Sequence, residues 1–264
     1  MDKKLLSIFT GAAIAVFGCS LAQGAEIFFP ATQIEKGFGA LSVYSAASDK
    51  KFSFQVRTDD EIRAVGYSVF TGGTNDIESP GKGQATVAKY LVNPADGKYF
   101  WLKAGTGSYE LELPSNTVKN TLSGSEKGVI MGAGVRSRLF PDTVVSPAVS
   151  VELGVDYERY NLNRNVQSNS AVSVIDKKLE FVNIQAAVVV SKELKRIVPY
   201  GGLKVFRTSV TLTDNNNNGK AKGEKDNAGV FIGAKVSLLK QVGFTVESSF
   251  VGETSFAFGF NIRF

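Results

Sequence analysis

The residue types that most often carry enzyme chemistry are scarce in this chain of 264 residues. It contains no histidine and a single cysteine, Cys19. Nucleophile pairs of the Ser/His or Cys/His type, HExxH zinc sites and haem groups with a histidine ligand all need an imidazole. The sequence therefore predicts that the protein is not an enzyme.

Other arrangements that could do chemistry have simpler interpretations. Asp156 and Glu158 could work as an acid and a base, but carboxylates two residues apart in a strand share one face, where ion pairing is the commoner role. The segment 214–219 (DNNNNG) matches the opening of a calcium loop, yet position twelve is Lys225 where a bidentate acid is needed. The two Gly-x-Gly segments are not followed by a helix, so they do not favour phosphate binding. We expect no metal and no cofactor.

The N-terminus has the pattern of an export signal. Two lysines precede an apolar stretch that is too short to cross a bilayer as a mature helix, and the small residues of SLAQGAE follow it. Cleavage fits after Ala22 or after Gly24, and both remove Cys19. We adopt a signal peptide of residues 1–24 and a single mature domain of residues 25–264. The alternative is a lipoprotein box, VFGC, in which Cys19 carries lipid.

The mature region has the rhythm of an all-β chain. Apolar and polar residues alternate in segments of about ten residues, separated by Gly, Pro, Asn and Asp clusters. After the first thirty positions no apolar stretch is long enough for a membrane helix. Twelve strands are predicted, with ten as the alternative if 36–46 and 51–57 do not both join the wall. Their ranges are 36–46, 51–57, 61–70, 84–92, 98–112, 128–139, 146–160, 178–191, 199–212, 227–238, 242–251 and 254–264.

The connections alternate between short and long. The short ones are 57–61, 93–97, 140–145, 192–198 and 239–241. The long polar ones are 71–83, 114–127, 161–177 and 213–226. Short turns on one rim, long loops on the other and both termini on the short-turn side are the layout of a transmembrane antiparallel up-and-down β-barrel. Two brief connections, 47–50 and 252–253, are exceptions on the long-loop rim.

The face pattern separates a membrane barrel from a secreted β-sandwich. Strand 146–160 places valines and Leu153 on one face and charged residues on the other, which either fold would allow. The last strand, SFAFGFNIRF, is more specific because it places four phenylalanines and one isoleucine on a single face and ends in phenylalanine. These residues are Phe256, Phe258, Phe260, Ile262 and Phe264.

An aromatic final strand that ends in Phe, behind an export signal, resembles the Gram-negative outer-membrane β-barrel proteins. Over the whole mature chain the resemblance consists of the regular succession of strands and turns. Only the last ten residues share a sequence motif. It implies a cell outer membrane location, contact with outer-membrane lipid, and recognition of the five residues just named by the barrel-assembly machinery. Independently of the resemblance, a closed sheet suits hydrocarbon because it pairs every backbone group.

The charged faces of the strands predict the lining of the lumen. Basic residues fall in the short-turn half: Arg57, Lys89, Lys103, Arg136, Arg138, Lys204, Lys235 and Arg263. Acidic residues lie higher, with Asp156 and Glu158 toward the long-loop rim and Glu152 and Glu247 near the middle. A ring of cations favours anions in a pore. The alternative is that Arg136 and Glu152, near neighbours across the 140–145 turn, belong to a ladder of ion pairs that packs the lumen shut.

Two functions follow from these patterns. The first is a narrow pore for small hydrophilic solutes with a weak anion preference. The second is a non-transporting barrel with a structural or surface-interaction role. The charges of the long loops nearly cancel, so no nucleic-acid partner is expected. The oligomeric state and the identity of any solute stay open.

Overall fold

The computed structural model describes residue 28 and residues 36–56, 58, 61, 64–65, 75–113, 120–124, 126–167, 172–216 and 219–264. The predicted signal peptide, with Cys19, and Arg57 lie outside these residues. Among the described residues no helix is long and apolar enough to cross a membrane.

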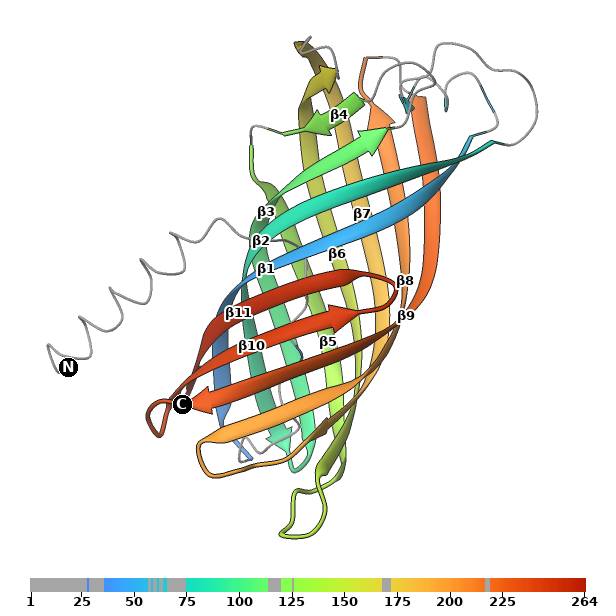
Figure 1. Cartoon of the computed structure of the whole chain (residues 1–264). Helices are drawn as coiled ribbons and strands as arrows, with labels where there is room; N and C mark the ends of the chain where they lie inside the picture. Colours follow the sequence, from blue (N-terminus) through green and yellow to red (C-terminus); the bar gives the residue numbers. More distant parts are fainter. Residues whose placement is uncertain are drawn as a thin grey trace, which may run out of the picture.

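Within the described residues, eleven strands form one antiparallel sheet that closes on itself (Figure 1). All but β4 are joined in a ring of ten, in which each strand pairs with its sequence neighbours and β11 pairs with β1. The prediction of an up-and-down barrel is confirmed. The strands are β1 (Gly39–Val56), β2 (Asn75–Ala95), β3 (Lys98–Leu113), β4 (Asn120–Ser123), β5 (Gly128–Phe140), β6 (Ala148–Gln167), β7 (Val172–Ser191), β8 (Ile197–Asp214), β9 (Gly219–Ser237), β10 (Val242–Phe250) and β11 (Thr254–Arg263).

The count of twelve strands is wrong, and the alternative of ten is the number in the ring. Segments 36–46 and 51–57 are parts of one strand, β1, which runs straight through the predicted connection at 47–50. The predicted strand 61–70 begins instead as a helical turn, in which the Val65 amide donates to the Glu61 carbonyl. Thr58 and Glu61 bond reciprocally to each other's backbone amides in a capping box, which starts helices.

The predicted long polar loops are largely strand. β6 and β7 continue to Gln167 and from Val172, so they occupy most of the predicted loop 161–177, and β8 and β9 do the same in 213–226. Most outward side chains of these extensions are polar, as in a loop, with Val172 and Val174 as exposed exceptions, whereas inward positions such as Leu162 and Leu212 are apolar and fully buried. These strands therefore lack the outward row of apolar residues by which a membrane strand is usually recognised in a sequence.

The ring narrows from ten strands to eight along its axis. β10 and β11 have only 9 and 10 residues, and their hairpin ends well below the upper end that orange β8 and β9 reach in Figure 1. Beyond the hairpin, β1 pairs directly with β9, Ser53 opposite Glu224. Short β4 replaces β5 between β3 and β6 at the same end. The eight strands above the hairpin form an extension of the barrel.

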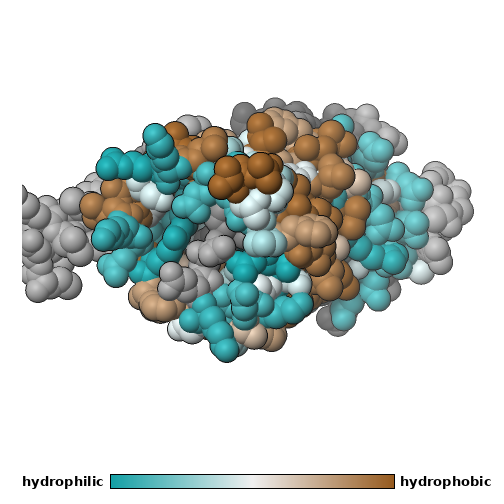
Figure 2. Space-filling view, turned by 90° about the horizontal axis from the view of Figure 1, so that it is seen from below, coloured by the Kyte–Doolittle hydropathy of each residue, from teal (hydrophilic) through white to brown (hydrophobic). Residues whose placement is uncertain are grey.

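The outer surface of the ten-stranded part is an apolar belt. Its side chains include Leu102, Leu153, Ile184, Leu203 and Ile232, which are 52 to 63% exposed. Viewed from the short-turn end, hydrophobic side chains gather in patches flanked by hydrophilic ones (Figure 2). The predicted face of the last strand belongs to this surface, with Phe256 and Phe264 exposed and the residues between them in the sequence alternating out and in.

Candidate functional site: the barrel lumen

Every described residue that was predicted to line the lumen lies on the inward face of its strand. Two groups differ in burial. Lys89, Lys103, Arg136, Lys204, Lys235, Glu152, Asp156 and Glu247 are buried. Arg138, Arg263 and Glu158 are half-buried. Most of the basic side chains do not stand as a ring of cations, because carboxylates lie between them.

The first group of ion pairs joins β2, β5 and β6. Glu152 accepts hydrogen bonds from Lys89 Nζ at 3.1 Å and from Arg136 Nε at 2.7 Å, and both Lys89 and Glu152 are 0% exposed. Arg136 lies directly opposite Glu152 in the β5 and β6 register. Glu152 thus bridges two cations, and such charge-assisted hydrogen bonds are strong where the local dielectric is low.

The indole ring of Trp101 packs against this group of ion pairs. Lys89 Nζ lies 4.1 Å from the centroid of the indole, a cation–π contact. The indole occupies space left by Gly134 and Gly154 on the facing strands, where any Cβ would collide with it. The Gly-x-Gly segment at 132–134 therefore makes room for a tryptophan and serves packing.

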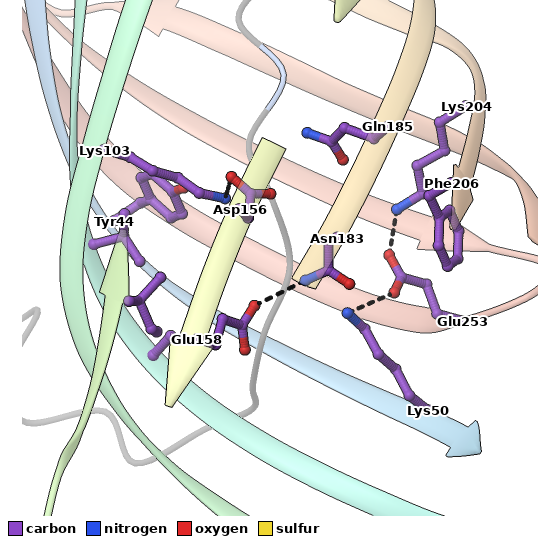
Figure 3. Close-up of a pocket in the computed structure, with 13 residues that line it drawn as sticks. Tyr44, Lys50, Lys103, Asp156, Glu158, Asn183, Gln185, Lys204, Phe206 and Glu253 are labelled. Atoms are coloured by element: carbon purple, nitrogen blue, oxygen red, sulfur yellow. Dashed lines mark hydrogen bonds and ion pairs between the residues drawn. The ribbon is translucent and has the colours of Figure 1, made fainter. Parts of the chain in front are cut away.

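A second group of ion pairs lies further up the lumen (Figure 3). Lys103 Nζ is 2.9 Å from Asp156 Oδ1, and Lys50 Nζ is 3.2 Å from Glu253 Oε2. Lys204 also bonds to Glu253, whose carboxylate lies between the two lysines in Figure 3. Lys50 and Glu253 were missed because both fall in segments predicted as connections. Lys50 does keep the even-numbered phase of the inward residues of β1, and that signal could have found it.

Little open space remains between these groups. The cavity lined by Lys50, Lys103, Asp156, Lys204 and Glu253 has a volume of about 40 Å³. A single water needs about 10 to 15 Å³ by this measure, so the cavity has room for a few waters. This cavity by itself is too small for a hydrated solute.

The eight-stranded extension is filled by an apolar core that sequence reasoning did not foresee. Seventeen buried residues from β1 to β4 and β6 to β9 and from the helical turn contact one another inside it. The rings of Tyr109 and Phe181 have centroids 5.0 Å apart, those of Tyr109 and Tyr160 5.4 Å, and those of Phe52 and Phe181 5.2 Å. Eight strands enclose an interior that side chains just fill, and here they fill it with aromatic rings.

Two inward charges form no ion pair with any described residue. Lys235 is buried, and the repulsion from Arg263, another cation, acts on it more strongly than the attraction of Glu193. Glu247 accepts a hydrogen bond from the Tyr200 hydroxyl at 2.9 Å and forms no ion pair. Within the described ranges there is no cluster of three carboxylates or thiols that could hold a metal.

Comparison with known proteins addresses the fold. No family model and no curated protein matches the chain. Among solved structures, the outer-membrane protease OmpT from Escherichia coli has a TM-score of 0.55 at 9% identity, covering 89% of this chain and 100% of that one. The fold is that of an outer-membrane β-barrel.

Other solved barrels are similar at lower scores. The outer membrane protein OprG from Pseudomonas aeruginosa has a TM-score of 0.44 at 9% identity, covering 89% of this chain and 99% of its own. Ail, the attachment invasion locus protein of Yersinia pestis, has 0.34 at 10%, covering 87% and 100%. Fold likeness at these identities carries no activity across. The fold and the apolar belt are those of a barrel that lies in the outer membrane.

Proposed function

We propose that this barrel is a non-transporting outer-membrane protein with a structural or surface-interaction role, in which the extension holds the outer loops away from the membrane. The aromatic core of the extension carries the proposal, because it occupies the route that a solute would take. The ion-paired lumen below it supports the same reading. Of the two functions that the sequence allowed, this is the second.

The energetic cost of opening supports a closed resting state. Taking one large apolar side chain out of a packed core costs about 1.5 to 3 kcal/mol. A passage past Phe52, Tyr109, Tyr160 and Phe181 would expose several of them together. Such an opening would cost on the order of 10 kcal/mol without a ligand to offset it.

We also propose that the barrel is not an enzyme. Glu152, Asp156 and Glu253 each bond to lysine or arginine, so none is a free carboxylate poised to exchange a proton with a substrate. The chain has no histidine to act in their place.

Electrical recording from refolded protein in a planar bilayer tests the closed state. We expect no step conductance from protein whose folding is verified by a heat-dependent mobility shift. Discrete conductance steps from the wild-type barrel would overturn the proposal. Co-flotation with lipid vesicles serves as the control that silent protein has inserted.

The alternative is a narrow pore with a weak anion preference. It is favoured by two cations at the short-turn end, Lys235 and Arg263, which interact with each other and form no ion pair among the described residues. If conductance is seen, reversal potentials across a salt gradient should then show anion preference, and Arg136→Glu should reduce it. Cation preference would exclude this alternative.

The assembly role of the last strand is a further part of the proposal. The outward positions Phe256, Phe258, Phe260 and Ile262, with the terminal Phe264, form an aromatic row at the edge where the sheet closes on β1. We propose that the barrel-assembly machinery reads this row and that outer-membrane lipid covers it afterwards.

A further inference from the structure

Two neighbouring turns at the short-turn rim form one continuous apolar surface. They are the turn between β7 and β8 (192–196) and the turn between β9 and β10 (238–241), and the Ser237 amide beside the second donates to the Arg196 carbonyl of the first at 2.7 Å. Below the wall, Ile197 lies opposite Val236, so the surface follows directly on the outward rows of the sheet. Its large apolar side chains are 48 to 56% exposed: Leu194, Ile197, Leu238 and Leu239. The apolar belt thus continues onto the turns.

The same two turns carry an excess of positive charge. Lys195, Arg196 and Lys240 are exposed, and none of them forms an ion pair with a described residue. The fourth cation, Lys192, lies 2.9 Å from Asp142 in the neighbouring turn. Glu193 is the one carboxylate in the sequence of the two turns. Three exposed cations therefore stand beside an apolar surface.

The backbone of the first turn is not the one that a lysine favours. The amides of Leu194 and Ile197 donate to each other's carbonyls at 2.8 and 3.0 Å, which leaves Lys195 and Arg196 as a two-residue turn. Lys195 has a φ of +57°, at the position where such turns favour glycine. The turn thus keeps a charged side chain at a position that is strained for it.

The other end of the apolar belt has a different distribution of charge. There Arg207 Nη2 lies 2.5 Å from Glu224 Oε2. The exposed Lys82 lies opposite Asp49 on β1 and Glu110 on β3 in the strand registers. Cations and carboxylates are mixed at that boundary, whereas the two turns at the short-turn rim are mainly cationic.

The position of the two turns matches the headgroup layer of a bilayer. The hydrocarbon core is about 30 Å thick, and the polar layers on both sides bring the total to about 40 to 45 Å. Side chains that follow directly on the lipid-facing belt of a barrel therefore lie among headgroups. There an apolar side chain can reach the acyl chains while a neighbouring lysine or arginine meets a lipid phosphate.

We propose that these two turns are a binding surface for anionic phospholipids of the leaflet at the short-turn rim. Lys195, Arg196 and Lys240 bind the phosphate groups, and the leucines of the same turns contact the upper part of the acyl chains. The excess of cations and the continuity with the lipid-facing belt favour this partner over a soluble one. The inference goes beyond the proposed function and does not depend on whether the lumen is closed.

Native mass spectrometry of the whole barrel, folded in detergent, resolves each bound lipid and tests the surface. We expect the first phosphatidylglycerol to bind at least tenfold more tightly than the first phosphatidylcholine, whose own ammonium balances its phosphate. A lysine or arginine near an anionic surface contributes about a fivefold gain in affinity. The triple variant Lys195→Gln/Arg196→Gln/Lys240→Gln should therefore lose the preference. Equal affinities of the wild type for the two lipids would overturn the proposal.

The matched control is Lys82→Gln, which removes an exposed cation at the other end of the belt. It should keep the preference for phosphatidylglycerol, and its loss in this variant would show that the effect follows total charge and not these turns. Where the triple variant fails to fold, as judged by the heat-dependent mobility shift, Lys240→Gln alone should lower the affinity for phosphatidylglycerol about fivefold. An unchanged affinity in Lys240→Gln would count against the site.

The apolar contribution is tested by Leu238→Ser/Leu239→Ser. This variant should bind both lipids more weakly and leave the ratio of their affinities unchanged, whereas unaltered binding would contradict the contact with acyl chains. Glycerol phosphate, which has the headgroup chemistry without acyl chains, should not displace phosphatidylglycerol at equal concentration. Its displacement would assign the turns to a soluble phosphate compound. Dimers that form in the wild type and not in the triple variant would assign them to a second copy of the chain, and either result would overturn the proposal.

Discussion

The membrane section and the extension of this barrel are built with opposite polarity. In the lower part of β1 the outward residues are Leu41 and Val43, while further up the strand Lys51 faces outward and Phe52 and Phe54 face inward. The inward phase never changes, but the apolar residues move from the odd to the even positions. The same strands thus form a lipid-facing barrel below and a water-facing barrel with an apolar core above.

The side chains that fill the two sections also differ in the partners that they need. The wider ten-stranded section is spanned by long lysine, arginine and glutamate side chains that need partners, whereas the eight-stranded extension is narrow enough for rings to meet. Removing one member of an ion pair leaves a buried charge, while removing one ring leaves a cavity. The two sections should therefore fail in different ways when mutated.

Glu152→Ala should have the largest effect, because it removes the buried carboxylate that accepts hydrogen bonds from both Lys89 and Arg136. Losing one partner of a buried pair costs about 3 to 5 kcal/mol. Urea unfolding of the refolded barrel, followed by the heat-dependent mobility shift, would measure this loss. A triple variant, Lys89→Met/Arg136→Met/Glu152→Leu, is the control and should recover most of the stability; if it is as weak as the single variant, charge is not the cause.

Phe181→Ala should cost about 3 kcal/mol, toward the low end for a buried ring, because three neighbouring rings can shift toward the cavity. The damage should stay in the extension. Limited proteolysis is expected to cut the outer strands faster while the membrane section keeps its mobility shift. Simultaneous loss of both sections would contradict the separation drawn above.

Phe260→Lys tests the lipid-facing surface of the membrane section. Phe260 faces outward beside Phe244, with ring centroids 5.2 Å apart, and a lysine near the bilayer midplane costs about 2 to 4 kcal/mol. Folded barrel should fall, whereas Thr254→Lys, outward on the same strand at the outer end of the hairpin, should behave like wild type. Deletion of Phe264 should impair assembly in cells more than folding in detergent, and equal yields of all these forms in outer membranes would contradict the targeting role.

Asp142 lies in a turn at the short-turn rim, and its substitution should have the smallest effect on stability. Desolvation alone would raise the pKa of Asp142, but hydrogen bonds from Lys192 and from the Glu193 and Thr143 amides outweigh it and hold that pKa below its ordinary value of 3.8. A depressed pKa stabilises the fold above the ordinary value, and this contribution disappears as pH falls through the folded-state pKa. Asp142→Asn should flatten the loss of stability that begins at about pH 5 and continues as pH falls through the depressed folded-state pKa; an unchanged slope would show that the contact adds nothing.

Much of the membrane section could be predicted because its signal is local. The alternation in β6 and β11 gave the inward and outward faces, and the structure places Arg136, Glu152 and Asp156 on the inward side as expected. The extension was harder, since its outward residues are as polar as a loop and only alternate positions such as Leu162 and Leu179 are apolar. Glu253 could not be placed from a turn motif, because its partners Lys50 and Lys204 come from distant strands.

The sequence by itself determined the class of fold, the phase of the cleanly alternating strands such as β6 and β11, and the lack of histidine, because these depend on residue type and on a period of two along the chain. Only the tertiary structure decided that ten strands form the ring, that eight continue above it, and that the described inward residues form ion pairs below and an apolar core above. These properties depend on which distant strands pair and on how far each side chain reaches across the barrel. The spacing of residues along one strand determines neither the pairing of distant strands nor the reach of the side chains.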